Sequence, residues 1–178
     1  MVVLGDSLAI SPSRSESFPA VLQARLTDRR LPWTMLNAGV SGDTTSGGLR
    51  RVDALLGEEV GVLAVALGAN DGLRGVDVRM IEENLSAIIE RAKARGIRVL
   101  LCGMETPPLR GWEYSVEFHR LFPRLASRHA VPLVPFLLAG VALDPGMNGH
   151  DGIHPNANGA RRIAENVWPY LEPLVTNP

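Results

Sequence analysis

The chain has 178 residues, a length typical of one domain with a full hydrophobic core, so we expect residues 1–178 to form a single domain. Its charges nearly cancel, with 18 Lys and Arg against 19 Asp and Glu, and they are scattered rather than gathered in runs. This balance argues against nucleic acid and anionic membrane surfaces as partners.

The apolar runs are short. The two longest, residues 60–69 and 131–143, fall below the roughly 20 residues that a membrane-spanning helix needs, so we expect no integral membrane segment. The chain also opens without the basic and long apolar segments of a secretory signal. A cytoplasmic location and, if a signal peptide was removed, a periplasmic one both stay open. The single cysteine, Cys102, ends an apolar run and is predicted to be a buried structural thiol.

Five short runs rich in Val and Leu are predicted to be strands. Most are apolar at successive positions rather than at every second one, which is typical of strands buried on both faces of a parallel sheet. In chain order they are residues 2–4, 34–36, 62–67, 99–102 and 131–134.

Segments of helical period alternate with these strands. Residues 78–92 show it most clearly, with apolar side chains at three- and four-residue steps, charged residues between them, and Gly96 as a stop. Weaker patterns cover residues 19–28, 48–56, 116–128 and 160–174. The alternation of strand and helix predicts a doubly wound α/β fold with helices on both faces of the sheet.

Gly, Asn and Asp gather in four loops, at residues 5–7, 37–43, 68–75 and 148–158. The first three follow predicted strands directly, which places them at the carboxyl edge of the sheet, where open α/β folds bind ligands. Each loop taken alone has a simpler interpretation. Asp6 or Ser7 can cap a helix, residues 68–71 can form an Asx turn, and residues 148–158 can be a surface loop with an exposed His154.

Together the loops contain every group that acyl transfer by serine requires, namely a hydroxyl, a base, an acid that orients the base, and donors for an oxyanion. Asp151 and His154 are three residues apart, so both side chains can project to one side and leave one imidazole nitrogen for Ser7. The backbone N–H groups of Ser7 and Gly42 and the amide of Asn70 can supply the donors.

Four blocks in order, Gly5-Asp6-Ser7-Leu8, residues 37–43 (NAGVSGD), residues 68–71 (GAND) and residues 151–155 (DGIHP), resemble the motifs of the SGNH (GDSL) hydrolases. The flanking sequence resembles the bacterial acyl-CoA thioesterase I, lysophospholipase and arylesterase branch over nearly the whole chain. The resemblance implies a flavodoxin-like, three-layer α/β/α fold with a five-stranded parallel sheet, and a serine esterase without a metal or other cofactor.

Carried over by position, the resemblance assigns Ser7 as nucleophile, His154 as base, Asp151 as its orienting acid, and Ser7, Gly42 and Asn70 as the oxyanion hole. We expect carboxylic ester or thioester substrates with short- to medium-chain acyl or aryl groups. Apolar residues in the neighbouring loops are candidates for an acyl groove, namely Leu73, Leu109, Trp112 and Met147, together with Met104, Pro107 and Pro108.

Several alternatives remain. Within the esterases, lysophospholipid or acyl-CoA hydrolysis can be the main activity. A metal-dependent phosphohydrolase would use His150, Asp151 and His154 as ligands, but the chain has only 4 histidines. A non-catalytic flavodoxin-like binding module would not need the Asp-x-x-His pair. The α/β-hydrolase fold requires a G-x-S-x-G elbow, which residues 5–9 do not provide.

Overall fold

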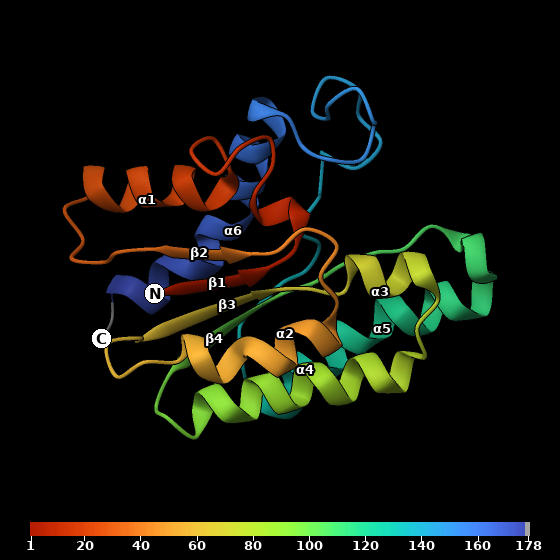
Figure 1. Ribbon diagram of the computed structural model, residues 1–178, viewed down its shortest axis with the longest axis horizontal. Helices are drawn as coiled ribbons and strands as arrows, with labels where there is room; N and C mark the ends of the chain where they lie inside the picture. The colour runs from red at the N-terminus through yellow and green to blue at the C-terminus, as the bar shows by residue number, and fades with distance from the viewer. Residues whose placement is uncertain (177–178) are drawn as a thin grey trace.

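The computed structural model describes residues 1–176 and places a parallel β-sheet between two layers of helices (Figure 1). Its five strands lie in the order β2-β1-β3-β4-β5, the flavodoxin-like order, in which the connections change direction between β1 and β3. The predicted three-layer α/β/α fold is therefore confirmed. The strands are β1 (Val2–Gly5), β2 (Leu36–Gly39), β3 (Val62–Ala66), β4 (Arg98–Cys102) and β5 (Leu133–Val134).

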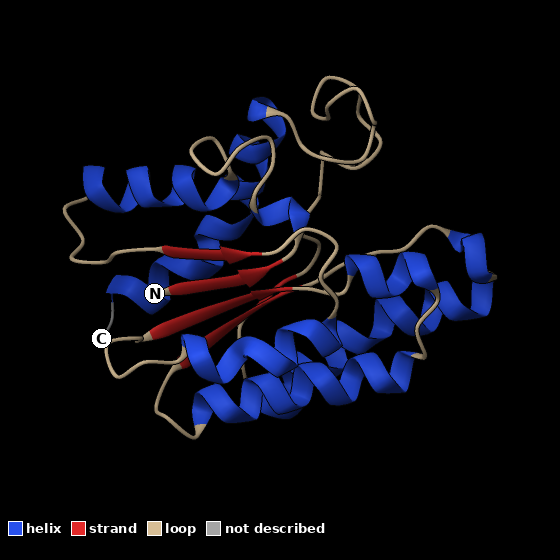
Figure 2. Ribbon diagram, viewed as in Figure 1, coloured by secondary structure: helices blue, strands red, loops and turns tan. Residues whose placement is uncertain are grey.

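Helices cover both faces of the sheet (Figure 2). Helices α1 (Phe18–Asp28) and α6 (Ala157–Thr176) pack together on one face, and α2 (Thr45–Arg51), α4 (Val78–Lys93) and α5 (Trp112–His129) cover the other. The short helix α3 (Ala69–Arg74) lies beyond the carboxyl end of β3. Within residues 1–176, no helix is both long and apolar enough to cross a membrane.

The central strands are buried because their sequences are apolar on both faces. Every residue of β1 and β3 is buried, and helix side chains close the core on each side of the sheet. Cys102 at the end of β4 belongs to this core at 1% exposure, and burial raises the pKa of its thiol to about 12. The prediction of a buried structural thiol is confirmed.

Two strands differ from the sequence prediction. The second strand begins at Leu36 rather than at residue 34, and it is only partly buried because it forms the edge of the sheet next to β1. The fifth strand has only two residues, Leu133–Val134, instead of residues 131–134. Pro132 explains this difference, because it has no N–H for the ladder, although its carbonyl accepts from the Leu101 N–H at 3.0 Å.

The helices around the site also differ from the prediction. Helix α2 begins at Thr45 rather than residue 48, since the Thr44 hydroxyl caps it by accepting from the Gly47 N–H at 3.3 Å. A short 3-10 turn at Val52–Leu55 follows it. The Gly68–Asp71 segment, for which an Asx turn was considered, opens helix α3 instead. Two further 3-10 turns, Ser7–Ala9 and Pro108–Arg110, follow β1 and precede α5.

Candidate active site

Ser7 lies at the carboxyl end of the central strand β1. The chain leaves β1 at Gly5 and turns at once into the 3-10 segment Ser7–Ala9, and the Asp6 carboxylate caps that segment by accepting from the Leu8 N–H at 2.9 Å. Only glycine fits at position 5, since a Cβ there would lie 2.7 Å from the Cβ of Ala9. The tight turn holds Ser7 at the sheet edge, where it is only partly buried.

His154 joins Ser7 to Asp151 in one continuous chain of hydrogen bonds. The His154 Nε2 atom lies 2.9 Å from the Ser7 Oγ, and the Nδ1 atom lies 2.6 Å from the Asp151 Oδ2. An ionised carboxylate can only accept, so the Nδ1 atom carries the proton and the Nε2 atom accepts from the Ser7 hydroxyl. The imidazole is thus held in the tautomer that can take a proton from Ser7.

The Asp151 carboxylate also fixes its own loop. Its Oδ1 atom accepts from the N–H groups of Ile153 and His154, both at 3.0 Å. These bonds, led by the one to the His154 side chain, hold the pKa of Asp151 well below its usual range although the carboxylate is exposed. The Gly149 N–H donates to the His154 carbonyl at 2.8 Å and braces the same loop.

Gly42, in the loop after β2, and Asn70, in the first turn of α3 after β3, lie at the same edge of the sheet. Gly42 has a φ of 72°, a left-handed conformation that favours glycine, and within residues 1–176 its N–H donates to no other group. The Asn70 amide nitrogen donates to the Asp43 carbonyl at 3.0 Å and to the Asp6 Oδ2 at 3.2 Å. The predicted donors therefore lie on the segments that follow β1, β2 and β3, at the carboxyl edge where the strand order changes direction.

Sequence reasoning missed Arg51, which binds the loops of the site to one another. Its guanidinium donates to the Gly5 carbonyl at 3.0 Å and the Ala38 carbonyl at 2.7 Å, and its Nε atom lies 2.8 Å from the Asp43 Oδ2. One side chain thus connects the ends of β1 and β2 with the loop that carries Gly42. Arg51 stands among ordinary charges of a helix, so its spacing along the chain gave no signal.

Asp71, also missed, ties α3 to α2. Asp71 is 1% exposed. Its Oδ2 atom accepts from the Thr45 N–H at 3.0 Å, and its Oδ1 atom accepts from the Thr45 hydroxyl at 2.7 Å. Asp6 is buried more completely, at 0% exposure. Burial raises the pKa of Asp6 to about 6, against the opposing effect of the hydrogen bonds that its carboxylate accepts.

The four residues expected in an acyl groove differ in exposure. Leu73 on α3, Leu109 in the 3-10 turn and Trp112 at the start of α5 are 44%, 73% and 74% exposed, whereas Met147 packs against the core. Met104 is 2% exposed and lies beneath Gly68, so its place in a groove was wrong.

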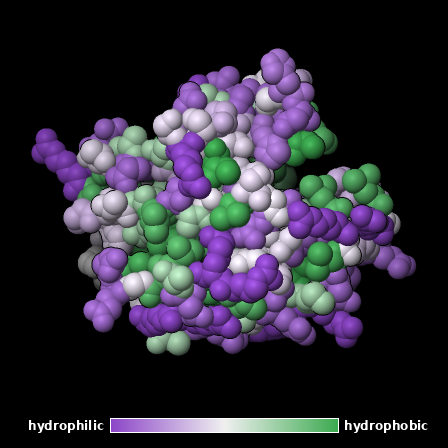
Figure 3. Space-filling view, viewed as in Figure 1, coloured by the Kyte–Doolittle hydropathy of each residue, from purple (hydrophilic) through white to green (hydrophobic). Residues whose placement is uncertain are grey.

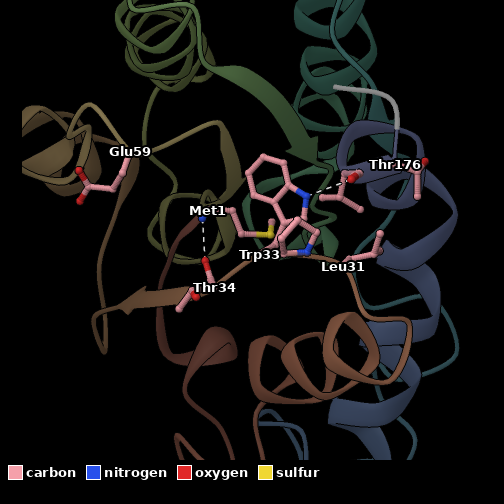
Figure 4. Close-up of a pocket in the computed structure, with 8 residues that line it drawn as sticks. Met1, Leu31, Trp33, Thr34, Glu59 and Thr176 are labelled. Carbon is pink, nitrogen blue, oxygen red and sulfur yellow. Dashed lines mark hydrogen bonds between the residues drawn. The ribbon is translucent and has the colours of Figure 1, made fainter.

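Two pockets of about 540 Å³ do not have Ser7 among their lining residues. One is at the amino edge of the sheet, where Met1, Trp33 and Thr34 surround it and the Trp33 indole donates to the Val175 carbonyl at 2.9 Å (Figure 4). The other lies between the loop after β4 and α5 and is lined by Trp112, Pro108 and the paired side chains of Glu105 and His119. Among the described residues, His, Cys, Asp and Glu form no group of three that could hold a metal ion.

A serine hydroxyl that is linked through an imidazole to a carboxylate, at the carboxyl edge of a flavodoxin-like sheet, is an arrangement of serine hydrolases. Comparison with known proteins agrees with this class. The model of the GDSL-like Lipase/Acylhydrolase family matches residues 3–162. The chain belongs to this family and is an SGNH-type hydrolase, which confirms the resemblance seen in the four blocks.

Individual relatives extend over nearly the full chain. Esterase TesA of Pseudomonas aeruginosa is 43% identical over 98% of this chain and 89% of its own length. Thioesterase 1/protease 1/lysophospholipase L1 of Escherichia coli K12 is 36% identical over 99% of this chain and 85% of its own. A crystal structure of TesA superposes with a TM-score of 0.92 at 41% identity, covering 97% of this chain and 98% of the other.

Proposed function

We propose that the protein hydrolyses carboxylic esters or thioesters with short- to medium-chain acyl or aryl groups, through an acyl-enzyme formed on Ser7. The observation that carries this proposal is the unbroken hydrogen-bonded series from Asp151 through His154 to Ser7, with contacts of 2.6 and 2.9 Å. The names of the two relatives, an esterase and a thioesterase with lysophospholipase activity, support the substrate class.

In the first half-reaction the Ser7 Oγ attacks the acyl carbonyl carbon while the His154 Nε2 takes the hydroxyl proton. The imidazolium then gives this proton to the departing alcohol or thiol, so the acyl group remains on Ser7. In the second half-reaction a water molecule loses a proton to the same nitrogen and attacks the acyl carbon. The carboxylic acid leaves and Ser7 recovers its proton.

The negative charge that develops on the carbonyl oxygen requires donors fixed before the reaction. The Gly42 N–H, which donates to no other group among residues 1–176, and the Ser7 N–H at the start of its 3-10 turn supply two of them. The Asn70 amide supplies a third when the hydrogen that the Asp43 carbonyl accepts in the free protein is shared with the oxyanion. Asp151 stays ionised and holds the imidazole in the required tautomer. It also stabilises the imidazolium through the same 2.6 Å contact.

Replacement of Ser7 by Ala tests the nucleophile. We expect the variant to keep its melting temperature and to lose turnover of p-nitrophenyl butyrate by at least about 10³-fold, since no other group forms the acyl-enzyme. Substantial esterase activity in Ser7→Ala would remove Ser7 from this role.

The substrate preference depends on the exposed apolar side chains beside the site. Figure 3 shows hydrophobic patches on both sides of a hollow between the 140–154 loop and the end of the molecule formed by α3 and the 108–110 turn. Leu73, Leu109 and Trp112 belong to that end, and Leu143 and Ile153 to the loop, all at least 44% exposed. Side chains so exposed contribute little to folding, so they are free to contact an acyl chain or an aryl ring.

A series of p-nitrophenyl esters from acetate to palmitate, assayed beside acyl-CoA and lysophospholipid, distinguishes the substrates. For Trp112→Ala and Leu109→Ala we expect kcat/KM to fall by about tenfold on medium chains and little on acetate. Leu36→Ala is the control, because Leu36 is 52% exposed at the start of β2, at the other edge of the sheet. Equal losses on all chain lengths would refute the groove, and a strong preference for lysophospholipid or acyl-CoA would favour that alternative.

A further inference from the structure

We propose that Asp6 is a positioning residue for Asn70, and that its single carboxylate joins the turn that carries the nucleophile to the amide that receives the oxyanion. The inference rests on the proposed function, because it presupposes that Asn70 serves as an oxyanion donor. It goes further in giving a part in the reaction to a buried side chain that does not face the substrate.

The two carboxylate oxygens of Asp6 have different partners. The Oδ1 atom accepts from the Leu8 N–H at 2.9 Å and so shapes the turn of Ser7, whereas the Oδ2 atom accepts from the Asn70 Nδ2 at 3.2 Å. These partners lie on the segments after β1 and β3, which are 64 residues apart in sequence from Asp6 to Asn70. Asp6 itself is 0% exposed, so water cannot take its place.

The Asn70 amide is thereby held from two sides. Its second contact goes to the Asp43 carbonyl at 3.0 Å, on the loop that also carries Gly42. The contact with Asp6 fixes one amide hydrogen and thereby directs the other, which the Asp43 carbonyl accepts in the free protein and which an oxyanion can share. Such preorganisation is what an oxyanion donor needs, since a displacement of about 1 Å can lower the rate by about 10²-fold.

The chemistry of this position requires a carboxylate. Two N–H donors converge on Asp6, and only a side chain with an acceptor at each end satisfies both. An asparagine has almost the same shape but carries one acceptor and one donor. Whichever way it is turned, its NH₂ group faces either the Leu8 N–H or the Asn70 amide, so one of the two contacts is lost.

A double-mutant cycle tests whether Asp6 acts through Asn70. We expect Asn70→Ala to lower kcat on p-nitrophenyl butyrate by about 10²- to 10³-fold, the usual effect of losing an oxyanion donor. Asp6→Asn is expected to lower kcat by about 10- to 10²-fold with KM changed less than threefold. In the double variant kcat should be no lower than in Asn70→Ala alone, because the amide that Asp6 positions is absent.

Two further variants separate positioning from folding. Asp6→Ser keeps an N-cap acceptor for Leu8 but cannot also reach Asn70, so it should lose kcat like Asp6→Asn while staying folded. Glu82→Gln is the matched control, since this carboxylate is 9% exposed and paired with Arg124 and Arg128 between α4 and α5. It should lower the melting temperature and leave kcat unchanged.

The outcomes are distinguishable. If the losses of kcat in Asp6→Asn and Asn70→Ala multiply in the double variant, the role of Asp6 is overturned and the proposed function stays intact. The same holds if Asp6→Ser has the kcat of the parent protein. An Asn70→Ala variant with full kcat would remove Asn70 from the oxyanion hole and overturn this inference with it.

Discussion

The buried carboxylate of Asp6 predicts an unusual dependence of stability on pH. Its pKa is raised to about 6, above the ordinary value of 3.8, chiefly because burial penalises the ionised form. The Leu8 N–H and the Asn70 amide favour ionisation, Asp43 opposes it, and His154 favours it when protonated. The perturbation we consider is Asp6→Asn, which removes the titration and nearly preserves the shape.

The sign and size of this pH dependence follow from the difference in proton binding between the folded and unfolded states. Between pH 3.8 and about 6 the folded protein binds a proton at Asp6 that the unfolded chain has lost, so this group makes the protein more stable as the pH falls. The shift of about two pKa units corresponds to about 3 kcal/mol at roughly 1.4 kcal/mol per unit. The ionised form at pH 7 therefore carries a folding cost of that order, which is absent below pH 4.

Urea unfolding of the parent protein and of Asp6→Asn, at half-unit steps from pH 4 to pH 8, measures this effect. The difference between the two free energies of unfolding should change by about 2.5 kcal/mol from pH 8 to pH 4, with the parent protein gaining relative to the variant as the pH falls. Asp151 does not interfere, because its lowered pKa places its opposite contribution below pH 3.8. A difference that stays constant with pH would refute the burial argument for Asp6.

Three other substitutions test the surroundings of the site. Gly42→Ala places a Cβ on a residue with a φ of 72°, so we expect a loss of about 1 kcal/mol in urea unfolding and a clear fall in kcat; an unchanged kcat would count against Gly42 as a donor. Asp151→Asn lets an amide donate to the His154 Nδ1 and reverses the tautomer, so kcat should fall on the order of 10² to 10⁴, and a smaller effect in steady-state assays would contradict the assigned role. Phe118→Ala empties a fully buried site beside Phe122, and it should lower the free energy of unfolding by about 3 to 5 kcal/mol; a loss below 1 kcal/mol would contradict the packing.

The strand pattern and the order of motifs were enough to predict the fold. Continuous apolar runs at β1, β3 and β4 indicated a sheet covered on both faces, and it forms as expected. The second strand was misplaced because its sequence, Leu-Asn-Ala-Gly, is polar and small. Asn37 remains in the strand because its amide donates to the Ala9 carbonyl at 2.7 Å, a contact between distant segments that local pattern does not reveal.

The sequence identified the catalytic candidates because their residue types occur in four short motifs that follow one another in a fixed order. Ser7, Asp151 and His154 could be selected from the sequence, and the structure brings them within hydrogen-bonding distance. Arg51 and Asp71 could not, because their importance comes from the backbone groups that they reach across the loops. The inward turn of Met104 also depended on packing beneath Gly68, which the sequence does not specify.

The central claim is that Ser7 is the nucleophile. Labelling of the folded protein with a fluorophosphonate, followed by peptide mapping, tests it most directly, because the reagent bonds to an activated serine. We predict one label, on Ser7, and none on the Ser7→Ala variant. A label on Ser41 or Ser46, two serines of the segment after β2, would contradict the account.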